Sequence, residues 1–148
     1  MKILVVEDNE HQQNLAKTQL AEHDVTTTAS YIEASRLMKA TVFDALLTDM
    51  HLPATTGYPL FSKFKGQDAE AGWALVLLAL DLNIPLIGCL SNGNHHNNLA
   101  SSLMDLFEYK VMTIGSSKVL LDNENFIDLG ASLEGDKLWN ELMKALQN

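Results

Sequence analysis

Short runs of apolar residues alternate with amphipathic segments along this chain, an order that predicts strands separated by helices. Residues 2–6 (Lys-Ile-Leu-Val-Val) are predicted to form a strand buried on both faces, because polar and apolar positions do not alternate within them. Residues 45–48 and 84–90 are two further predicted strands. Residues 25–28 are β-branched and more polar, which is typical of an edge strand.

Apolar residues at helical spacing predict helices between these strands, at residues 10–22, 30–39, 69–82, 99–107 and 136–146. Ser30 and Glu33 form the S-x-x-E pattern of a capped helix start, and Asp68 is predicted to cap the next helix. A fifth strand is expected at residues 111–114. Residues 118–121 either pair back on it as a hairpin or form a loop.

Strands alternating with helices predict an α/β fold, in which helices cover both faces of a parallel sheet through right-handed crossovers. We expect the 148 residues to form a single domain with its own core. Ligands of such sheets bind outside the carboxyl ends of the strands, near the point where the strand order reverses. Four polar residues are therefore expected at one edge of the sheet: Glu7, Asp8, Asp49 and Ser91.

Three of these residues are acids that follow two different strands. Glu7 and Asp8 follow the first strand, and Asp49 follows the strand at residues 45–48. If these strands are parallel neighbours, the three carboxylates converge, and their repulsion at neutral pH requires a cation or shared protons. The alternatives are a solvated acidic pair for Glu7 and Asp8, and a turn or helix-capping residue for Asp49.

Composition narrows the class of protein. The net charge of −9 argues against a broad electrostatic contact with nucleic acid. The longest apolar stretch, residues 74–80, is too short to cross a bilayer. Because a strand is predicted to begin at Lys2, we expect no signal peptide. The single cysteine, Cys89, excludes an internal disulfide framework. We expect a soluble cytoplasmic domain that binds neither nucleic acid nor membranes.

Two motifs resemble the receiver domain of bacterial two-component response regulators. Val5-Val-Glu-Asp-Asn9 is similar to the acidic pair after the first strand of that family. Residues 44–53 (Asp-Ala-Leu-Leu-Thr-Asp-Met-His-Leu-Pro), together with Gly57, are similar to the segment around its phospho-accepting aspartate. The resemblance covers most of the chain and implies a flavodoxin-like, doubly wound (βα)5 sandwich with a central five-stranded parallel sheet.

The resemblance also implies a chemistry and a partner. Asp49 would accept a phosphoryl group from a histidine kinase or phosphotransfer protein, as a signalling phosphoacceptor rather than an enzyme. Asp8 and Asp49 would hold Mg²⁺, with the main-chain carbonyl of His51 as a further ligand and Glu7 acting largely through water. Mg²⁺ prefers such hard oxygen ligands, and a carboxylate nucleophile needs a cation rather than a base.

Two positions depart from the pattern of the family. Ser91 is the candidate for the hydroxyl that bonds a phosphoryl oxygen, but it lies one place farther from Pro85 than usual, and a turn-former is its alternative role. No Lys-Pro follows the predicted fifth strand, so Lys118 is the nearest candidate for the lysine of the family, with an exposed charge as the alternative. The loop after Gly57 is also longer than ordinary receivers carry. We therefore interpret the chain as a divergent, stand-alone member.

The sequence suggests three candidate functions. The first is a phosphoacceptor that signals by contact with an unknown downstream protein, since we expect no output domain after residue 148. The second is a pseudo-receiver, a protein-interaction module independent of phosphorylation, which the missing Lys-Pro and the shifted Ser91 favour. The third, an aspartyl-phosphate hydrolase, is disfavoured because such enzymes need a second carboxylate where this chain has His51.

Overall fold

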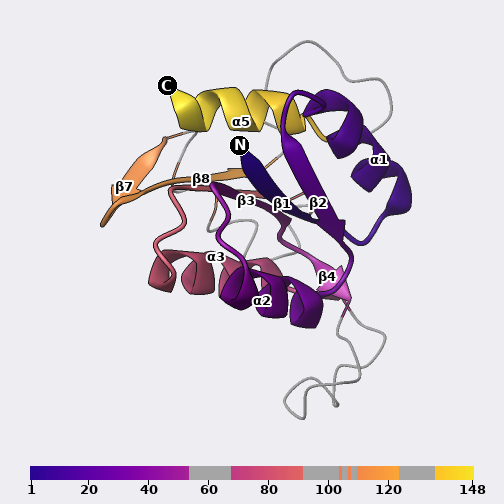
Figure 1. The fold of residues 1–148 in the computed structure, drawn as a ribbon, viewed down its shortest axis with the longest axis horizontal. Helices are drawn as coiled ribbons and strands as arrows, with labels where there is room; N and C mark the ends of the chain where they lie inside the picture. The colour runs from indigo at the N-terminus through magenta and orange to yellow at the C-terminus, as the bar shows by residue number, and fades with distance from the viewer. Residues whose placement is uncertain (54–67, 92–103, 105–106, 108–109, 124–135) are drawn as a thin grey trace.

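A computed structural model of the chain describes residues 1–53, 68–91, 104, 107, 110–123 and 136–148. In it, a mostly parallel six-stranded sheet lies between two layers of helices (Figure 1). The strand order is β2-β1-β3-β6-β8-β7. The strands are β1 (Lys2–Val6), β2 (Asp24–Thr28), β3 (Ala45–Asp49), β6 (Leu86–Ser91), β7 (Met112–Ile114) and β8 (Ser117–Asn123).

The first five strands in this order are parallel, and the order reverses beside β1, as in a flavodoxin-like sheet. The predicted fifth strand at residues 111–114 is wrong as a parallel strand, because β7 pairs antiparallel with β8 at the edge. The hairpin alternative is confirmed, with Gly115 at a positive φ of 61° in its turn. β8 takes the inner position because it carries the buried residues Val119, Leu120 and Leu121.

Four helices are described: α1 (Glu10–Gln19), α2 (Tyr31–Ala40), α3 (Ala71–Asp81) and α5 (Trp139–Gln147). The Ser30 side chain caps α2 by accepting a hydrogen bond from the Glu33 amide at 3.4 Å, as predicted. The prediction that Asp68 caps α3 is wrong, because that helix begins after Glu70 and shows no side-chain cap. Asp68 belongs instead to β5 (Asp68–Ala69), which pairs antiparallel with β4 (Leu52–Pro53).

The sheet has an apolar core on each face. α2 and α3 cover one face, and α1 and α5 cover the other (Figure 1). Along β1 the side chains alternate between them, Leu4 and Val6 in the first core and Ile3 and Val5 in the second. This confirms that β1 is buried on both faces, which is the physical reason for its unbroken apolar run.

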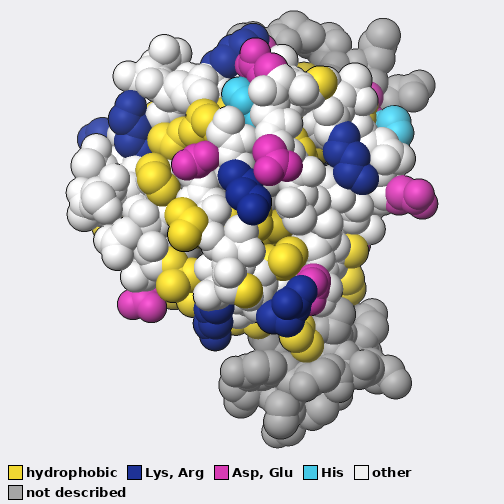
Figure 2. Space-filling view, viewed as in Figure 1, with side chains coloured by type: hydrophobic (Ala, Val, Ile, Leu, Met, Phe, Trp, Pro, Cys, Tyr) yellow, Lys and Arg dark blue, Asp and Glu magenta, His cyan; other side chains and the backbone are white. Residues whose placement is uncertain are grey.

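The expected helix at residues 99–107 lies almost entirely outside the described residues, as does the long loop with Gly57. Among the helices that are described, none is long and apolar enough to cross a membrane. On the face drawn in Figure 2, basic and acidic side chains lie interspersed among apolar ones.

Candidate metal centre

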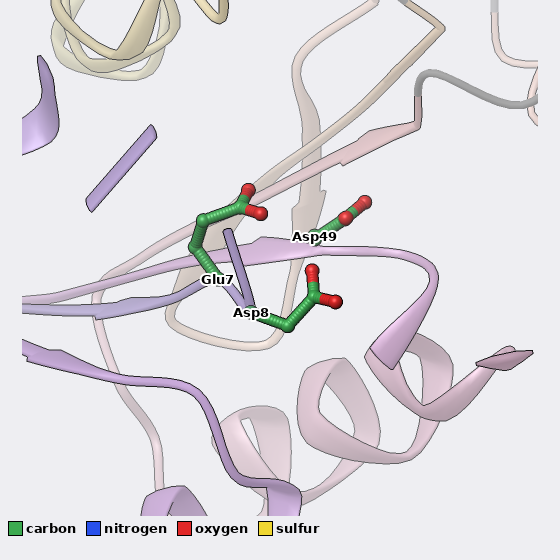
Figure 3. Close-up of side chains that lie close together, drawn as sticks. All are labelled: Glu7, Asp8 and Asp49. Atoms are coloured by element: carbon green, nitrogen blue, oxygen red, sulfur yellow. The ribbon is translucent and has the colours of Figure 1, made fainter. Parts of the chain in front are cut away.

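Three carboxylates meet at the carboxyl edge of the parallel sheet. Glu7 and Asp8 directly follow β1, and Asp49 is the last residue of the neighbouring strand β3. The register pairs Val6 with Thr48, so the two strands end at the same level. One oxygen from each carboxylate lies within 4.8 Å of the others (Figure 3). The convergence predicted from the sequence is therefore confirmed.

The three acids differ in their access to solvent. Glu7 is 1% exposed and Asp49 is 8% exposed, whereas Asp8 is exposed. The cluster is thus closed on the side of the sheet and open beside Asp8. An ion can reach such a site from solvent while two of its ligands are held by the core.

Backbone amides hold two of the carboxylates in place. The His51 amide donates a hydrogen bond to Oδ1 of Asp49 at 3.3 Å, and the Asn9 amide donates to Oε1 of Glu7 at 3.1 Å. Asn9 also caps α1, since its side chain accepts from the His11 amide at 2.9 Å. The turn after β1 therefore fixes Glu7 and starts the next helix together.

A buried lysine contacts two of the three acids. The ammonium group of Lys137 forms an ion pair with Oε2 of Glu7 and lies 2.9 Å from Oδ2 of Asp49. Its side chain is 2% exposed. With every group ionised, three carboxylates and one ammonium leave an excess of two negative charges, which is the charge of one divalent cation.

Burial and charge shift the titration of this pair. Burial raises the pKa of Glu7, the charge of Lys137 opposes that shift, and the charge of Asp49 adds to it. Burial alone lowers the pKa of Lys137, but attraction to Asp49 and Glu7 outweighs burial and raises it above its usual value. Lys137 therefore keeps its positive charge at neutral pH despite its burial.

Of the other predicted site residues, Ser91 reaches this edge and Lys118 does not. Ser91 is the last residue of β6 and fully buried, one place beyond Leu90, which pairs with Asp49. Lys118 pairs with Leu86 at the start of β6, so it lies four residues, roughly 13 Å, back along the sheet from the level of Asp49. Lys118 is far from the acidic cluster because β8 begins at Ser117, so Lys118 lies at the amino end of that strand, whereas the cluster lies at the carboxyl ends.

The sequence placed the lysine of the family at Lys118 and did not point to Lys137. This residue lies just before α5, and residues 124–135 separate it from the end of β8. Its ion pair with Glu7 joins residues 130 positions apart, which no local pattern reveals. The available signal was a lysine placed directly before the apolar start of the last helix, Leu138-Trp139.

Gly72 is a second residue that the sequence did not single out. Its amide donates to the carbonyl of Met50 at 3.0 Å in the first turn of α3. A Cβ at this position would lie 2.4 Å from the carbonyl oxygen of Asp49 and 2.7 Å from Cα of Met50. Glycine therefore lets α3 approach the backbone of the Asp49 turn, whereas Gly57, named from the sequence, lies outside the described residues.

The donor set suits a hard divalent cation. All three side chains offer carboxylate oxygens, and the exposed Asp8 leaves room for bound water. Mg²⁺ favours one or two carboxylates together with several retained waters. The chemistry of these residues therefore fits a divalent cation such as Mg²⁺.

Several solved structures are similar to this chain, and three of them are described here. The N-terminal domain of a response regulator/sensory box/GGDEF 3-domain protein from Carboxydothermus hydrogenoformans matches at 13% identity over 99% of this chain and 91% of that chain, with a TM-score of 0.54. The receiver domain of the Francisella response regulator 1452 matches at 22% identity over 82% and 83%, with a TM-score of 0.49. The Mn²⁺-bound form of response regulator Rcp1 matches at 19% identity over 69% and 73%, with a TM-score of 0.48. No curated protein matches the chain.

The model of the family described as response regulator receiver domain matches residues 3–87. The match spans more than half of the chain and includes Glu7, Asp8 and Asp49, the three carboxylates that the fold brings together. The similarity to the Carboxydothermus domain supports the same fold. The chain belongs to the response regulator receiver domain family.

Proposed function

We propose that this receiver domain is a signalling phosphoacceptor and that Asp49 takes the phosphoryl group. The observation that carries the proposal is the convergence of Glu7, Asp8 and Asp49, with one oxygen of each within 4.8 Å of the others. The donor is the phosphohistidine of a histidine kinase or phosphotransfer protein. A downstream protein reads the change by contact.

The transfer is a displacement at phosphorus. An oxygen of Asp49 forms a bond to phosphorus while the bond to the imidazole nitrogen of the donor breaks, and the imidazole leaves with the electron pair. The nucleophile is already a carboxylate and needs no base. The main obstacle is repulsion between the incoming anion and the acidic cluster, so positive charge at the site determines the rate.

Two sources supply that positive charge. Asp8, Asp49 and the main-chain carbonyl of His51 would hold Mg²⁺, with Glu7 acting through water. When bound, Mg²⁺ neutralises charge on the transferring phosphoryl group. Lys137, already 2.9 Å from Oδ2 of Asp49, bonds a phosphoryl oxygen, the role that the resemblance had suggested for Lys118. The hydroxyl of Ser91 bonds another.

We propose further that residues 1–148 act as a single receiver-like domain. The support is the second core, where Trp139 and Leu142 of α5 pack with Ile3 and Val5 of β1. The helix next to Lys137 and the strand that leads to Glu7 are thereby joined by one apolar cluster.

Intact mass spectrometry tests the phosphoacceptor. The protein is incubated with a small phosphodonor such as acetyl phosphate and Mg²⁺, and we expect a mass gain of one phosphate. Asp49→Asn is expected to gain none. Asp81→Asn, which changes an exposed acid at the end of α3, is the matched control and keeps the gain. A gain in Asp49→Asn equal to that of the unaltered protein would refute the assignment.

The second candidate is a pseudo-receiver that acts as a protein-interaction module without phosphorylation. The observation that favours it is the closed ion pair of Lys137 with Glu7 and Asp49, which neutralises part of the cluster without a metal. The same assay separates the two functions. An unaltered protein that gains no phosphate from saturating donor, while it still binds Mg²⁺, supports the pseudo-receiver.

A further inference from the structure

Lys137 lies in a short segment before α5 that is not part of the sheet. Residues 124–135 separate it from β8, and α5 begins two residues later, at Trp139. A buried ammonium needs a fixed direction of approach, because a small displacement costs both its ion pairs and its charge compensation. The anchor for this segment must therefore come from outside the β8 ladder.

Two glutamines of α1 bond both backbone groups of Lys137. Oε1 of Gln12 accepts a hydrogen bond from the Lys137 amide at 2.9 Å. Nε2 of Gln19 donates to the Lys137 carbonyl at 3.0 Å, and Oε1 of Gln19 accepts from the Asn140 amide at 3.3 Å. These contacts hold the peptide on either side of the Lys137 Cα, which sets where its side chain starts.

The helix that carries these glutamines is itself tied to the cluster. Gln12 and Gln19 lie seven residues apart, close to two turns, so they share one face of α1. Gln13, the residue after Gln12, donates a hydrogen bond from its Nε2 to the carbonyl of Glu7 at 2.7 Å. α1 therefore bonds the backbone of Glu7 and the backbone of Lys137, the two partners of the buried ion pair.

The contacts that Gln12 and His11 of α1 make with residues 136–137 differ in strength. Gln12 is 7% exposed, and the amide it bonds belongs to a buried residue, so loss of this hydrogen bond leaves a buried donor unpaired. The His11–Asp136 contact, 2.8 Å long, is largely exposed and contributes little. The hydrogen bond from the Lys137 amide to Gln12 is therefore expected to contribute more than the exposed His11–Asp136 contact.

We propose that Gln12 and Gln19 are positioning residues, which clamp the Lys137 peptide and so direct its ammonium group toward Asp49. This inference rests on the proposed function, because the clamp matters for the phosphoryl group that Lys137 contacts. The clamp explains how Lys137 can contact the phosphoryl group although no Lys-Pro follows β8. In this chain α1, rather than β8, orients the lysine.

A purely structural role of the glutamines is the competing explanation, since α1 and α5 also pack through Ala16 and Trp139. A double-mutant cycle separates the two. If Gln12 acts through Lys137, its substitution slows phosphorylation when Lys137 is present and has no further effect in Lys137→Met. If the glutamine only supports folding, its effect is the same in both backgrounds.

The experiment measures the rate of phosphate gain from acetyl phosphate with Mg²⁺, per folded protein as determined by thermal unfolding. Gln12→Met and Gln19→Met keep the length of the side chain and remove its hydrogen bonds. We expect each to lower the rate about fivefold, because each substitution removes one hydrogen bond to the Lys137 backbone. Gln147→Met, at the exposed end of α5, is the matched control and keeps the full rate.

The possible outcomes distinguish failure of the clamp from failure of the proposed phosphoacceptor function. A fivefold loss that disappears in Lys137→Met supports the clamp. Phosphorylation of the unaltered protein with full rates in both glutamine variants, or with losses that persist in Lys137→Met, overturns the clamp alone. An unaltered protein that takes no phosphate overturns the proposed function and the clamp with it. If Lys137→Met does not fold, Lys137→Gln serves as the background.

Discussion

At the scale of single residues, the charge of the cluster is set by Lys137. Its burial is tolerated because two carboxylates, those of Glu7 and Asp49, contact its ammonium group. A buried charge that loses its partner is strongly destabilising, whereas an exposed one is not. The two candidate lysines of this chain should therefore differ sharply when replaced.

Lys137→Met is expected to lower the rate of phosphorylation about 100-fold, because it removes the positive charge that faces the phosphoryl oxygen. Lys118→Met is the matched control and is expected to keep the rate, because Lys118 stands at the far end of β8. Mass spectrometry of phosphate gain against time checks both. If Lys118→Met lowered the rate of phosphate gain and Lys137→Met did not, Lys118 would be the lysine that contacts the phosphoryl group, as the sequence suggested.

The same substitution has a consequence for stability without Mg²⁺. Lys137→Met leaves Glu7 and Asp49 buried without their cation, which is expected to cost about 3–5 kcal/mol of unfolding free energy. Added Mg²⁺ is expected to recover part of this loss by binding the folded state. Urea unfolding with and without Mg²⁺ measures both effects. Equal stability of the two proteins in the absence of metal would argue against the buried ion pair.

At the scale of elements, the contact between α3 and the end of β3 shapes the Asp49 turn. The amide of Gly72 bonds the Met50 carbonyl, and the Met50 amide bonds the Leu90 carbonyl at 2.7 Å. The turn is thus held between α3 and β6. Room for that arrangement exists because Gly72 carries no Cβ.

Gly72→Ala is expected to displace α3 from the Asp49 turn, because its Cβ would lie 2.4 Å from a backbone oxygen that cannot move aside alone. We expect a loss of phosphorylation rate and of Mg²⁺ affinity per folded protein. Gly115→Ala is the control at the other end of the sheet. It strains the β7–β8 turn at φ 61° by about 1–2 kcal/mol but leaves the site intact.

Contradiction would come from the reverse pattern. Normal phosphorylation and Mg²⁺ binding in Gly72→Ala would show that the close approach of α3 does not shape the site. Loss of either property in Gly115→Ala would show that the hairpin at the opposite edge influences Asp49. Thermal unfolding of both variants separates these effects from simple instability.

At the scale of the whole molecule, the packing of α5 joins the C-terminal segment to the sheet. Leu142 is fully buried, and its side chain occupies the space beside Gly88, where a Cβ would lie 2.7 Å from Cδ2 of Leu142. β6 and α5 therefore fit each other closely, and the segment that carries Lys137 folds against the same core as β1.

Leu142→Ala is expected to lower the free energy of unfolding by about 2–5 kcal/mol, because it opens a cavity between α5 and the sheet. Leu77→Ala, at a side chain 64% exposed on α3, is the matched control and should change stability by less than about 0.5 kcal/mol. Unfolding is followed by circular dichroism and by Trp139 fluorescence in a Trp73→Phe background. Two separate unfolding transitions, one by each probe, would contradict the proposal that residues 1–148 act as a single domain.

Local pattern was enough to predict the parts of this fold that depend on neighbouring residues. The run at residues 2–6 became β1 with the predicted bounds, and the acids after β1 and β3 converged because parallel neighbours end together. The fifth strand was misplaced because two short apolar runs, at 111–114 and 118–121, competed, and burial in the sheet decided between them.

Contacts between distant residues were beyond such patterns. Lys137 meets Glu7 across 130 positions and Gln12 across 125, so its role depends on how α1 and α5 pack rather than on its own neighbours. Gly72 also became visible only when α3 was placed against the backbone of Met50. The sequence thus located the acidic half of the site, and the tertiary structure supplied the cationic half.

The central claim, that Asp49 accepts a phosphoryl group at a cation-dependent site, has one most direct measurement. The protein is treated with acetyl phosphate in Mg²⁺ or in EDTA, reduced with borohydride, digested and sequenced by mass spectrometry. Borohydride reduces an acyl phosphate to an alcohol and so marks the modified side chain. We predict a mark at Asp49 in Mg²⁺ and its absence in EDTA. A mark at another residue, or none in Mg²⁺, would contradict the account.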